Sequence, residues 1–252
     1  MKRISEIREE FRNLNPEQIE EKIEHFRTDE RKGVQKLLET ERKKLARYKE
    51  ELERIENLCY FEKKYESRGL ICGVDEVGRG PLAGPVVAGA VILPRGSRIL
   101  YINDSKKLSA KKREELYEVI SREALSFSFG MATPERIDEI NILQATYEAM
   151  RQAISGLSVS PDLLLNDAVT IPGVSTDQVA IVHGDARSIS IGAASIMAKV
   201  FRDRMMVEFD SIYPGYGFAS NKGYGSKEHL EALGRLGPCP IHRRSFIKNF
   251  CS

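Results

Sequence analysis

The segment that most restricts the fold of this chain is GVDEVGRGPLAGPVVAGAVIL, residues 73–93, in which two adjacent carboxylates interrupt a long apolar run. Apolar β-forming residues before and after its loop predict two strands inside a sheet. Burying an unpaired carboxylate is costly in free energy, so Asp75 and Glu76 need a cation or hydrogen-bond donors nearby. Considered alone, they have an ordinary alternative, which is a capping or salt-bridged pair.

The loop after these carboxylates begins with the tripeptide Gly78-Arg79-Gly80. Glycines at this position allow backbone amides to approach a ligand closely, with Arg79 near a phosphate, although a tight turn with a surface arginine has the same sequence. Successive strand residues face opposite sides of a sheet, so Asp75 and Glu76 cannot both point straight at one ion. We expect either a local distortion at the glycines or a peripheral position for Glu76.

Strands and helices alternate along the remainder of the chain, which predicts an α/β fold with a mixed sheet flanked by helices. Ser109 is a good amino-terminal cap, and Thr133 followed by Pro134 indicates a second helix start. The small residues after Asp185 are typical of a helix packed tightly against a sheet. The expected strands are 70–77, 86–93, 125–132, 162–167 and 178–185, and the expected helices are 109–125, 133–157 and 186–210.

Residues 1–68 have almost no β signal and predict an all-helical amino-terminal extension. Asn15 as a cap and Pro16 as the first helical residue mark one helix start. A long charged helix follows, and its apolar stripe at heptad spacing serves either helix packing and pairing or the gripping of a substrate. Glycine becomes frequent from Gly69, so we place a second domain at 69–252. The stripe consists of Val34, Leu38, Leu45, Tyr48, Leu52, Ile55 and Cys59.

The charge balance excludes the overall signature of a strongly basic nucleic-acid binder, because 39 Lys and Arg residues face 37 Asp and Glu residues, a net charge of +2. Binding to nucleic acid would depend on local patches. Residues 221–249 are one such patch, rich in basic side chains, and an ordinary solvated surface is the alternative.

The cysteines and the chain start point to a cytoplasmic protein. Cys59, Cys72, Cys239 and Cys251 lack CxxC spacing and histidines at zinc-binding distances, so we expect reduced thiols and no structural zinc. The start MKRISEIREE is too charged for a signal peptide, and no apolar run approaches the roughly 20 residues of a membrane span.

Two further carboxylates lie where strands are expected to end. Asp167 follows one strand, and Asp185 lies between a strand and the start of a helix. Carboxylates gathered at strand ends raise each other's pKa unless cations neutralise them. Oxygen ligands without nearby His or Cys select Mg²⁺ or Mn²⁺, and two such ions about 4 Å apart can hydrolyse a phosphodiester.

Six motifs together resemble bacterial ribonuclease HII, in the family's order and at compatible spacings. The resemblance covers about residues 70–247, whereas residues 1–70 resemble only the helical extension of some members. It implies a ribonuclease H-like fold and cleavage of RNA in RNA·DNA hybrids and of single ribonucleotides in duplex DNA, for ribonucleotide removal. The motifs are GVDEVGRGPLAGPVVAGAVIL, NDSKKLS, LNDAV, GDARSISIGAASIMAKVFRD, NKGYGSKEH and HRRSF.

The resemblance also implies roles for individual residues. The carboxylates would bind Mn²⁺ or Mg²⁺, with two ions in the substrate complex. Gly78, Arg79 and Gly80 would read the ribose 2′-OH and the adjacent phosphate, because the 2′-OH distinguishes RNA from DNA. Tyr224 would stack on the sugar after the ribonucleotide, although an isolated tyrosine is commonly a core residue. The metal-binding and catalytic set is Asp75, Glu76, Asp167 and Asp185.

Further positions in the motifs are expected to contact the nucleic-acid backbone, although lysines at a helix start are commonly just solvated. Asp203 lies either behind the metal ligands or in a surface pair with Arg202, which we favour. His183 and His242 are expected to be structural. The backbone-binding set is Asn103, Ser105, Lys106, Lys107, Ser188, Arg243 and Arg244.

Two residues depart from the family's pattern. Asn166 occupies a position where the family has an apolar strand residue, so its amide must be satisfied in a core strand and the placement of Asp167 is in question. Gly192 stands where alanine is commoner, and we expect it only to soften its helix, by up to about 1 kcal/mol.

The expected reaction is attack of a metal-activated water on the phosphate 5′ to the ribonucleotide, leaving a 3′-OH and a 5′-phosphate, by a monomeric protein. One alternative is a resolvase- or transposase-like nuclease of the same superfamily, which would cut all-DNA duplex. Another is a non-catalytic hybrid-binding protein whose extension recruits partners. The GRG tripeptide and Tyr224 argue against the first, and four intact carboxylates argue against the second.

Overall fold

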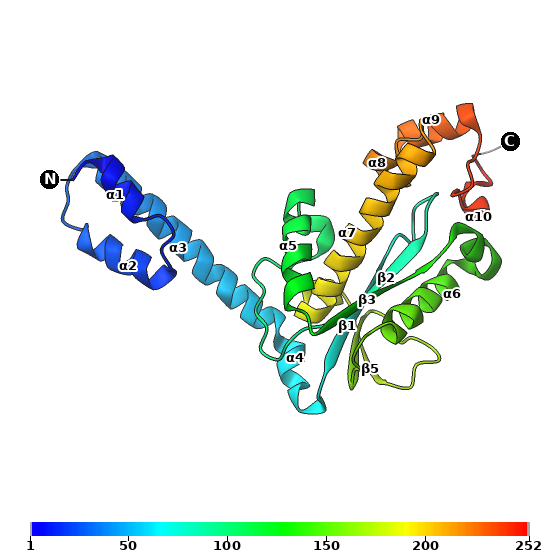
Figure 1. The fold of residues 1–252 in the computed structure, drawn as a ribbon, viewed down its shortest axis with the longest axis horizontal. Coiled ribbons are helices and arrows are strands. Elements are labelled where there is room, and N and C mark those ends of the chain that lie inside the picture. The colour runs from blue at the N-terminus through cyan, green and yellow to red at the C-terminus, as the bar shows by residue number, and fades with distance from the viewer. Residues whose placement is uncertain (1, 251–252) are drawn as a thin grey trace. The chain divides into compact units, whose positions relative to one another are not determined.

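The computed structural model describes residues 2–250 and forms two compact units, Met1–Glu56 and Asn57–Ser252 (Figure 1). The division of roles between 1–68 and 69–252 stays a prediction. Within the described residues, no helix combines the length and the apolar character needed to cross a bilayer.

Three of the four cysteines are buried, namely Cys59, Cys72 and Cys239. Cys251 lies outside the described residues.

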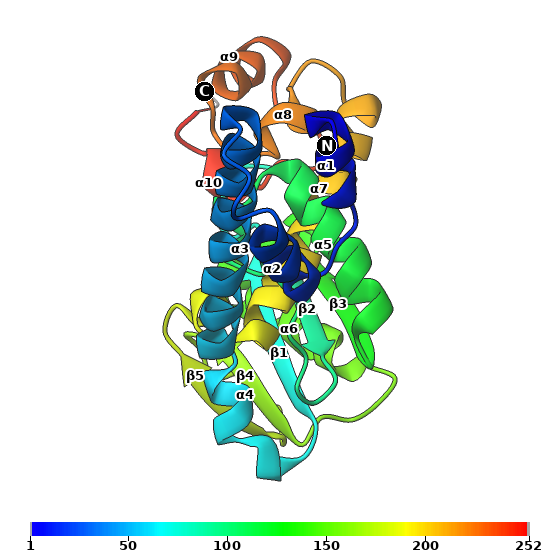
Figure 2. The same ribbon diagram turned by 90° about the vertical axis from the view of Figure 1, so that its left-hand side faces the viewer.

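The first unit is helical, as predicted, with α1 (Ile4–Glu10) and α2 (Pro16–His25) lying along α3 (Lys32–Leu58) in both ribbon views (Figures 1 and 2). Asn15 caps α2, since its side chain accepts a hydrogen bond from the Gln18 amide. The three helices enclose a small apolar core, which includes Ile7, Phe11, Ile23, Phe26, Val34, Leu37 and Leu38.

The second unit contains a five-stranded mixed sheet in the order β3-β2-β1-β4-β5. β1 pairs antiparallel with β2, which pairs antiparallel with β3, whereas β1–β4 and β4–β5 are parallel. The central strand β1 therefore joins an antiparallel half to a parallel half. The strands are β1 (Ile71–Val77), β2 (Val86–Ile92), β3 (Ser126–Ala132), β4 (Leu163–Asp167) and β5 (Asp177–Ile181), so the mixed α/β class predicted from the sequence is confirmed.

Helices cover both faces of this sheet. Figure 1 shows α7 (Ile189–Ile212) on one face, with α5 (Ala110–Glu123) beside it, and α6 (Pro134–Ser155) on the other. Ser109 caps α5 and Thr133 caps α6, as predicted. Shorter elements are the helices α4 (Tyr60–Lys64), α8 (Phe218–Asn221), α9 (Lys227–Leu236) and α10 (Arg244–Ile247), and the 3-10 turns η1 (Glu66–Arg68), η2 (Ser105–Lys107) and η3 (Gly184–Ala186).

The pleat of β1 decides which face its side chains join. Cys72 and Val74 pack in the apolar core that includes α6 residues. Gly73 faces the opposite way, toward the start of α7. Because side chains alternate along a strand, Asp75 also faces α7.

The helix α7 approaches the sheet closely because small residues line the contact. A Cβ atom on Gly73 would lie 2.1 Å from the Ser190 carbonyl carbon, and one on Gly89 would lie 2.7 Å from the Ala194 oxygen. Only glycine allows this backbone approach at β1 and β2.

Two local expectations are corrected by this packing. A Cβ on Gly192 would lie 2.8 Å from Ile102 Cγ2 and 3.0 Å from the Asp185 oxygen, so this glycine provides space as well as softening its helix. The expected surface pair of Arg202 with Asp203 is wrong, because Arg202 is completely buried. Asp203 pairs instead with Lys199, at 2.6 Å, since residues four apart share a helix face.

We predict that Gly73→Ala lowers the free energy of unfolding by about 1–3 kcal/mol, because its methyl group would overlap the backbone of α7. Urea denaturation would measure this change. Gly234→Ala on α9 is the matched control, since its methyl group meets no atom within 4 Å and alanine favours a helix. Equal stability of the two variants would contradict the close packing of α7 on β1.

Candidate active site

A pocket of about 570 Å³ gathers most of the residues that the sequence singled out. It opens where β1 and β4 end and is bordered by α7, the loop after β1 and the turn η2. Its lining contains Asp75, Glu76, Val77, Gly78, Arg79, Gly80, Ser105, Lys106, Arg113, Asp167, Asp185, Ser195, Lys199 and Tyr224.

The pocket exists because β1 and β4 separate just before their carboxylates. Their pairing ends at Val74 and Asn166. Asp75, inside β1, and Asp167, the last residue of β4, come next, and alternate side chains of both strands face α7. The two carboxylates therefore emerge on the same side of the sheet, where the strands no longer fill the space between them.

Glu76 also lines the pocket, but at a more exposed position than Asp75. Its Oε1 lies 3.2 Å from Arg79 Nη1, in an ion pair that holds the carboxylate toward the GRG loop. The Glu76 amide donates to Asp75 Oδ1 at 2.8 Å. β1 stays paired with β2 through Val77, so the pocket accommodates both carboxylates without interrupting that ladder.

Asp185 comes from the turn η3, between β5 and α7. The amide of Gly184 donates to Asp167 Oδ1 at 2.7 Å, which ties this turn to the end of β4. His183 adopts a left-handed conformation, with φ of 56°, and this reverses the chain before the turn. A backbone contact therefore sets the position of Asp185 relative to Asp167.

The carboxylates destabilise one another's charged forms. Burial raises the pKa of Asp75 well above its usual range, and the charges of Glu76 and Asp167 raise it further, against a hydrogen bond from Ser195. Burial likewise raises the pKa of Glu76, against the nearby Arg79.

Asp185 belongs to the same electrostatic system. Burial raises its pKa, the charges of Asp104 and Asp167 add to the shift, and Lys106 opposes it. Raised pKa values in several carboxylates of one pocket are typical of a functional site.

The donor atoms fit a hard divalent cation. The four carboxylates supply only oxygen ligands, and no described His or Cys lines the pocket. Among residues 2–250, no three His, Cys, Asp or Glu side chains are arranged so that they alone could hold a metal ion. Carboxylate oxygens suit Mg²⁺ or Mn²⁺, and Mg²⁺ commonly keeps waters and substrate oxygens in its coordination shell, so these would complete the set.

The GRG loop and Tyr224 lie beside each other in the pocket. A Cβ on Gly80 would lie 3.8 Å from Tyr224 Cε1, so the ring is beside this glycine. The Leu82 amide donates to the Gly223 carbonyl at 2.8 Å and fixes the Tyr224 loop against the GRG loop. Tyr224 is 44% exposed, so its ring is not a core residue.

The residues predicted to bind phosphates divide into two groups. Ser105 and Lys106 line the pocket, and Ser105 Oγ lies 3.0 Å from Ser195 Oγ. Asn103, Lys107 and Arg244 do not line it. Lys107 and Arg244 are exposed. Their contact with a longer substrate, outside the pocket, stays a prediction.

Ser188 is not placed to meet a phosphate. It is completely buried, and its hydroxyl donates to Glu62 Oε1 at 2.5 Å, while the Ser190 amide donates to the same oxygen at 3.0 Å. The start of α7 does attract an anion, as its exposed N–H groups predict. That anion is the chain's own Glu62 carboxylate from α4.

Arg243 is also removed from the surface. It is completely buried and donates to backbone carbonyls of the loop after β1. The basic patch expected over 221–249 therefore lacks this side chain as a direct contact for a duplex. His242 is structural in this packing, since its Nε2 lies 3.0 Å from His229 Nε2 in a buried pair.

Three polar side chains of the pocket were not predicted from the sequence: Arg113, Ser195 and Lys199. Arg113 donates to the Ser105 carbonyl at 2.9 Å and holds the turn η2. Ser195, Lys199 and Asp203 recur every four residues, so they share one face of α7. This spacing along α7, which begins just after Asp185, was the sequence signal that could have identified Ser195 and Lys199 as pocket residues.

Asn166 is buried in β4 on the face away from Asp167. Its Nδ2 donates to Gln178 Oε1 at 2.8 Å, so part of its amide is satisfied by the neighbouring strand. Its Oδ1 has no hydrogen-bond partner. The departure at this position is therefore accommodated by Gln178 and does not displace Asp167 from the pocket.

Comparisons with known proteins agree along the chain. A family model for ribonuclease HII matches residues 72–249, and one for the ribonuclease HII N-terminal domain matches residues 3–66. Ribonuclease HII of Lachnoclostridium phytofermentans is 58% identical over 250 residues, covering 99% of this chain and 98% of that protein. Ribonuclease HII of Clostridioides difficile is 52% identical over 250 residues, covering 98% of each.

A solved structure shares the fold of the second unit. The crystal structure of ribonuclease H2 from Pyrococcus horikoshii has a TM-score of 0.61 and 28% sequence identity, covering 72% of this chain and 96% of that one. The ribonuclease H-like fold predicted from the motifs is confirmed.

We predict that Asp75→Asn stabilises the metal-free protein by about 0.5–2 kcal/mol at neutral pH. The raised pKa means that the folded protein holds this proton more tightly than the unfolded chain. The contribution of Asp75 to the free energy of unfolding is fully present at pH values below the ordinary pKa of aspartate. It is lost as the pH rises through the pKa of Asp75 in the folded protein. The gain from Asp75→Asn should therefore be larger at pH 8 than at pH 4.

Chemical denaturation in EDTA across that pH range measures this gain. Glu231→Gln, at an exposed carboxylate of α9, is the control and should change stability by less than about 0.5 kcal/mol. Adding Mn²⁺ should stabilise the wild type and have little effect on Asp75→Asn. Equal stabilisation of both proteins by Mn²⁺ would contradict a cation held by Asp75.

Proposed function

The chain belongs to the ribonuclease HII family and is a ribonuclease H that acts on RNA·DNA hybrids, and on this basis we propose that it also cuts duplex DNA 5′ to single embedded ribonucleotides. One observation carries the proposal. The GRG loop and Tyr224 line the same pocket as Asp75 and Asp167, so a ribose reader and a hydrolytic centre would share one cavity.

Recognition of the ribonucleotide would depend on backbone groups of the GRG loop. Gly78 has a φ of 89°, a conformation that favours glycine. Such recognition would require that the amides after it face the pocket. Amides of this kind can bind the 2′-OH and the adjacent phosphate, and no deoxynucleotide offers that hydroxyl. Tyr224, beside Gly80, would stack on the next sugar and favour an RNA-to-DNA junction.

The carboxylates Asp75, Glu76, Asp167 and Asp185 would hold the metal. Two divalent ions, Mn²⁺ or Mg²⁺, when bound, supply activation of the attacking water and stabilisation of the leaving oxygen. Asp75 is oriented by the Glu76 amide and Ser195, and Asp167 by the Gly184 amide, so both are preorganised. Lys106 and Arg79 bring positive charge to the phosphate side of the pocket.

The products would be a 3′-OH and a 5′-phosphate, because the ribose hydroxyl is recognised and is not the nucleophile. Such cuts would start ribonucleotide removal from DNA. We place this work in the cytoplasm, where the buried residues Cys59, Cys72 and Cys239 would stay reduced, and we expect the protein to act as a monomer.

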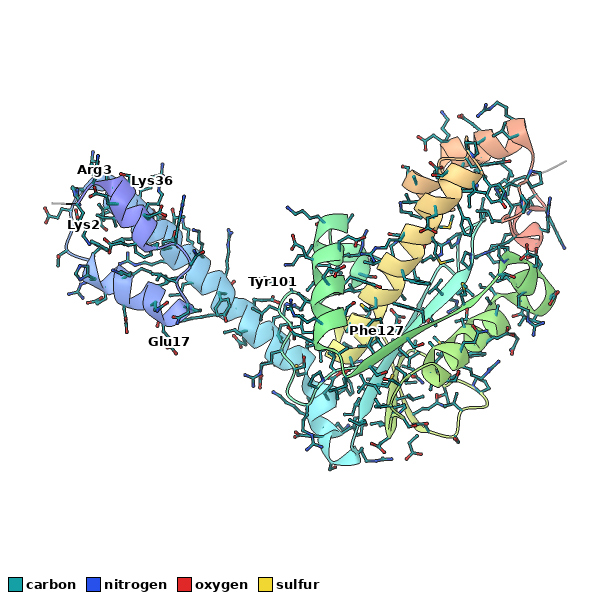
Figure 3. All side chains as sticks on the ribbon, viewed as in Figure 1. Lys2, Arg3, Glu17, Lys36, Tyr101 and Phe127 are labelled. Carbon is teal, nitrogen blue, oxygen red and sulfur yellow. The ribbon has the colours of Figure 1, made fainter. Side chains whose placement is uncertain are left out.

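The helical unit would add affinity for the duplex. Charged side chains such as Glu17 and Lys36 project outward from its helices (Figure 3). Attraction of its basic groups to phosphates would make this contribution sensitive to salt.

We predict a metal-dependent cut 5′ to one ribonucleotide in a DNA duplex, observed by mapping labelled products in Mg²⁺, Mn²⁺ or EDTA. The cut should be absent from an all-DNA duplex and should fall by at least about a hundredfold in Asp75→Asn, which loses one ligand charge. Cleavage of the all-DNA duplex would instead favour a general nuclease of the same fold. Binding without a cut under any metal would favour a non-catalytic hybrid-binding protein.

A 57–252 variant tests the helical unit, since it keeps Glu62 on the start of α7 and follows the division between the compact units. We expect KM to rise about three- to tenfold and its salt dependence to weaken, with kcat unchanged. Steady-state kinetics at several salt concentrations measure both quantities, and a thermal melt checks folding. Unchanged KM and salt dependence would contradict a role in substrate binding.

A further inference from the structure

Two arginines of the second unit, Arg202 and Arg243, are completely buried. Neither forms an ion pair with a described residue. Burial lowers the pKa of Arg202 to about 10 and, together with the charge of Arg202, that of Arg243 to about 9. Both side chains thus keep their positive charge at neutral pH without a carboxylate partner, which is costly unless other groups compensate.

Backbone carbonyls provide that compensation. Arg243 donates from Nη2 to the Gly78 oxygen at 2.6 Å, from Nη1 to the Arg79 oxygen at 2.8 Å and from Nε to the Gly84 oxygen at 2.9 Å. Its own amide donates to the Leu82 oxygen at 2.9 Å. One residue near the carboxyl end of the chain is therefore bound to the GRG loop through both its side chain and its backbone.

The chemistry of the peptide bond gives these contacts a consequence inside the pocket. The Gly78 carbonyl belongs to the same peptide group as the Arg79 N–H, and the Arg79 carbonyl belongs to that of the Gly80 N–H. A cationic donor on a carbonyl polarises its peptide group and strengthens the N–H on the other side as a hydrogen-bond donor, by about 10–30% per bond. It also fixes the orientation of that N–H.

We propose that Arg243 is a positioning residue for ribose recognition, which orients and polarises the Arg79 and Gly80 peptide groups from the side opposite to the substrate. The inference rests on the proposed function, in which those amides meet the ribonucleotide. It replaces the direct duplex contact that the sequence suggested for Arg243, because a buried guanidinium cannot reach a duplex.

The planar fork of arginine explains why this residue type is needed. Three N–H groups in one plane reach three carbonyls of a curved loop at once, and a lysine offers one ammonium that cannot span them. A lysine at this position keeps the charge and loses the geometry. The Arg243→Lys variant therefore tests orientation more than net charge.

Arg202 supplies a matched control. It is equally buried and also donates to three carbonyls, those of Pro85 at 2.9 Å, Lys222 at 2.9 Å and Ala83 at 3.1 Å. None of these carbonyls shares a peptide group with the Arg79 or Gly80 N–H. The two arginines thus have similar structural surroundings but differ in which peptide groups they hold.

The experiment measures ribose discrimination as a ratio of dissociation constants, the Kd of the all-DNA duplex divided by the Kd of the duplex with one ribonucleotide. Each variant is made in the inactive Asp75→Asn background, and its Kd in Mg²⁺ is determined by fluorescence anisotropy for a duplex with one ribonucleotide and for its all-DNA counterpart. We expect Arg243→Lys to reduce the ratio about tenfold, through weaker binding of the ribonucleotide duplex alone. Arg202→Lys should leave the ratio within about twofold, although both variants lower the melting temperature.

An unchanged ratio in Arg243→Lys would overturn the inference, and so would an equal loss in both variants, since that would reflect general support of the loop. If Arg243→Lys does not fold, the neutral Arg243→Gln, which keeps an amide donor, is measured in its place with the same expected loss. Equal binding of both duplexes by the Asp75→Asn parent would instead overturn the proposed ribose recognition. Failure of the inference and failure of the proposed function thus give different results.

Discussion

Repulsion among carboxylates at the ends of two parallel strands is the constraint on which the rest of this structure depends. β1 and β4 stop pairing at Val74 and Asn166, and Asp75 and Asp167 follow at once. Burial and like charge raise the pKa of Asp75, so the pocket costs folding free energy until a cation enters it. The close approach of α7 at Gly73, the hydrogen bond from Ser195 to Asp75 and the hydrogen bond from the Gly184 amide to Asp167 hold the two carboxylates in place despite that cost.

The opposite side of the pocket depends on buried positive charge. Arg202 and Arg243 are enclosed by carbonyl oxygens of the loop after β1, and the Tyr224 loop is hydrogen bonded to the same segment. Glu62 similarly places a carboxylate on the start of α7. In each case an internal charge is hydrogen bonded to backbone groups, for Glu62 together with the Ser188 hydroxyl, and these bonds help to fix the backbone on which the site is built.

Much of the fold followed from local patterns. Caps at Ser109 and Thr133, and alternating apolar runs, predicted the helices and strands because these signals act over a few residues. The motifs also predicted which carboxylates gather in one pocket. Asn166 beside Asp167 raised a doubt that the sequence could not resolve, because its partner Gln178 lies on a different strand.

The sequence by itself determined the order of elements, the mixed sheet and the oxygen-rich chemistry of the pocket, since these depend on residue type and spacing. Only the tertiary structure decided which polar side chains face solvent. Serine and arginine are residue types that commonly bind phosphates. In this structure, however, Ser188 binds Glu62 and Arg243 binds carbonyl oxygens of the GRG loop. The physical reason is that burial and hydrogen-bond partners come from segments distant in sequence, here up to 165 residues apart, and no local pattern records them.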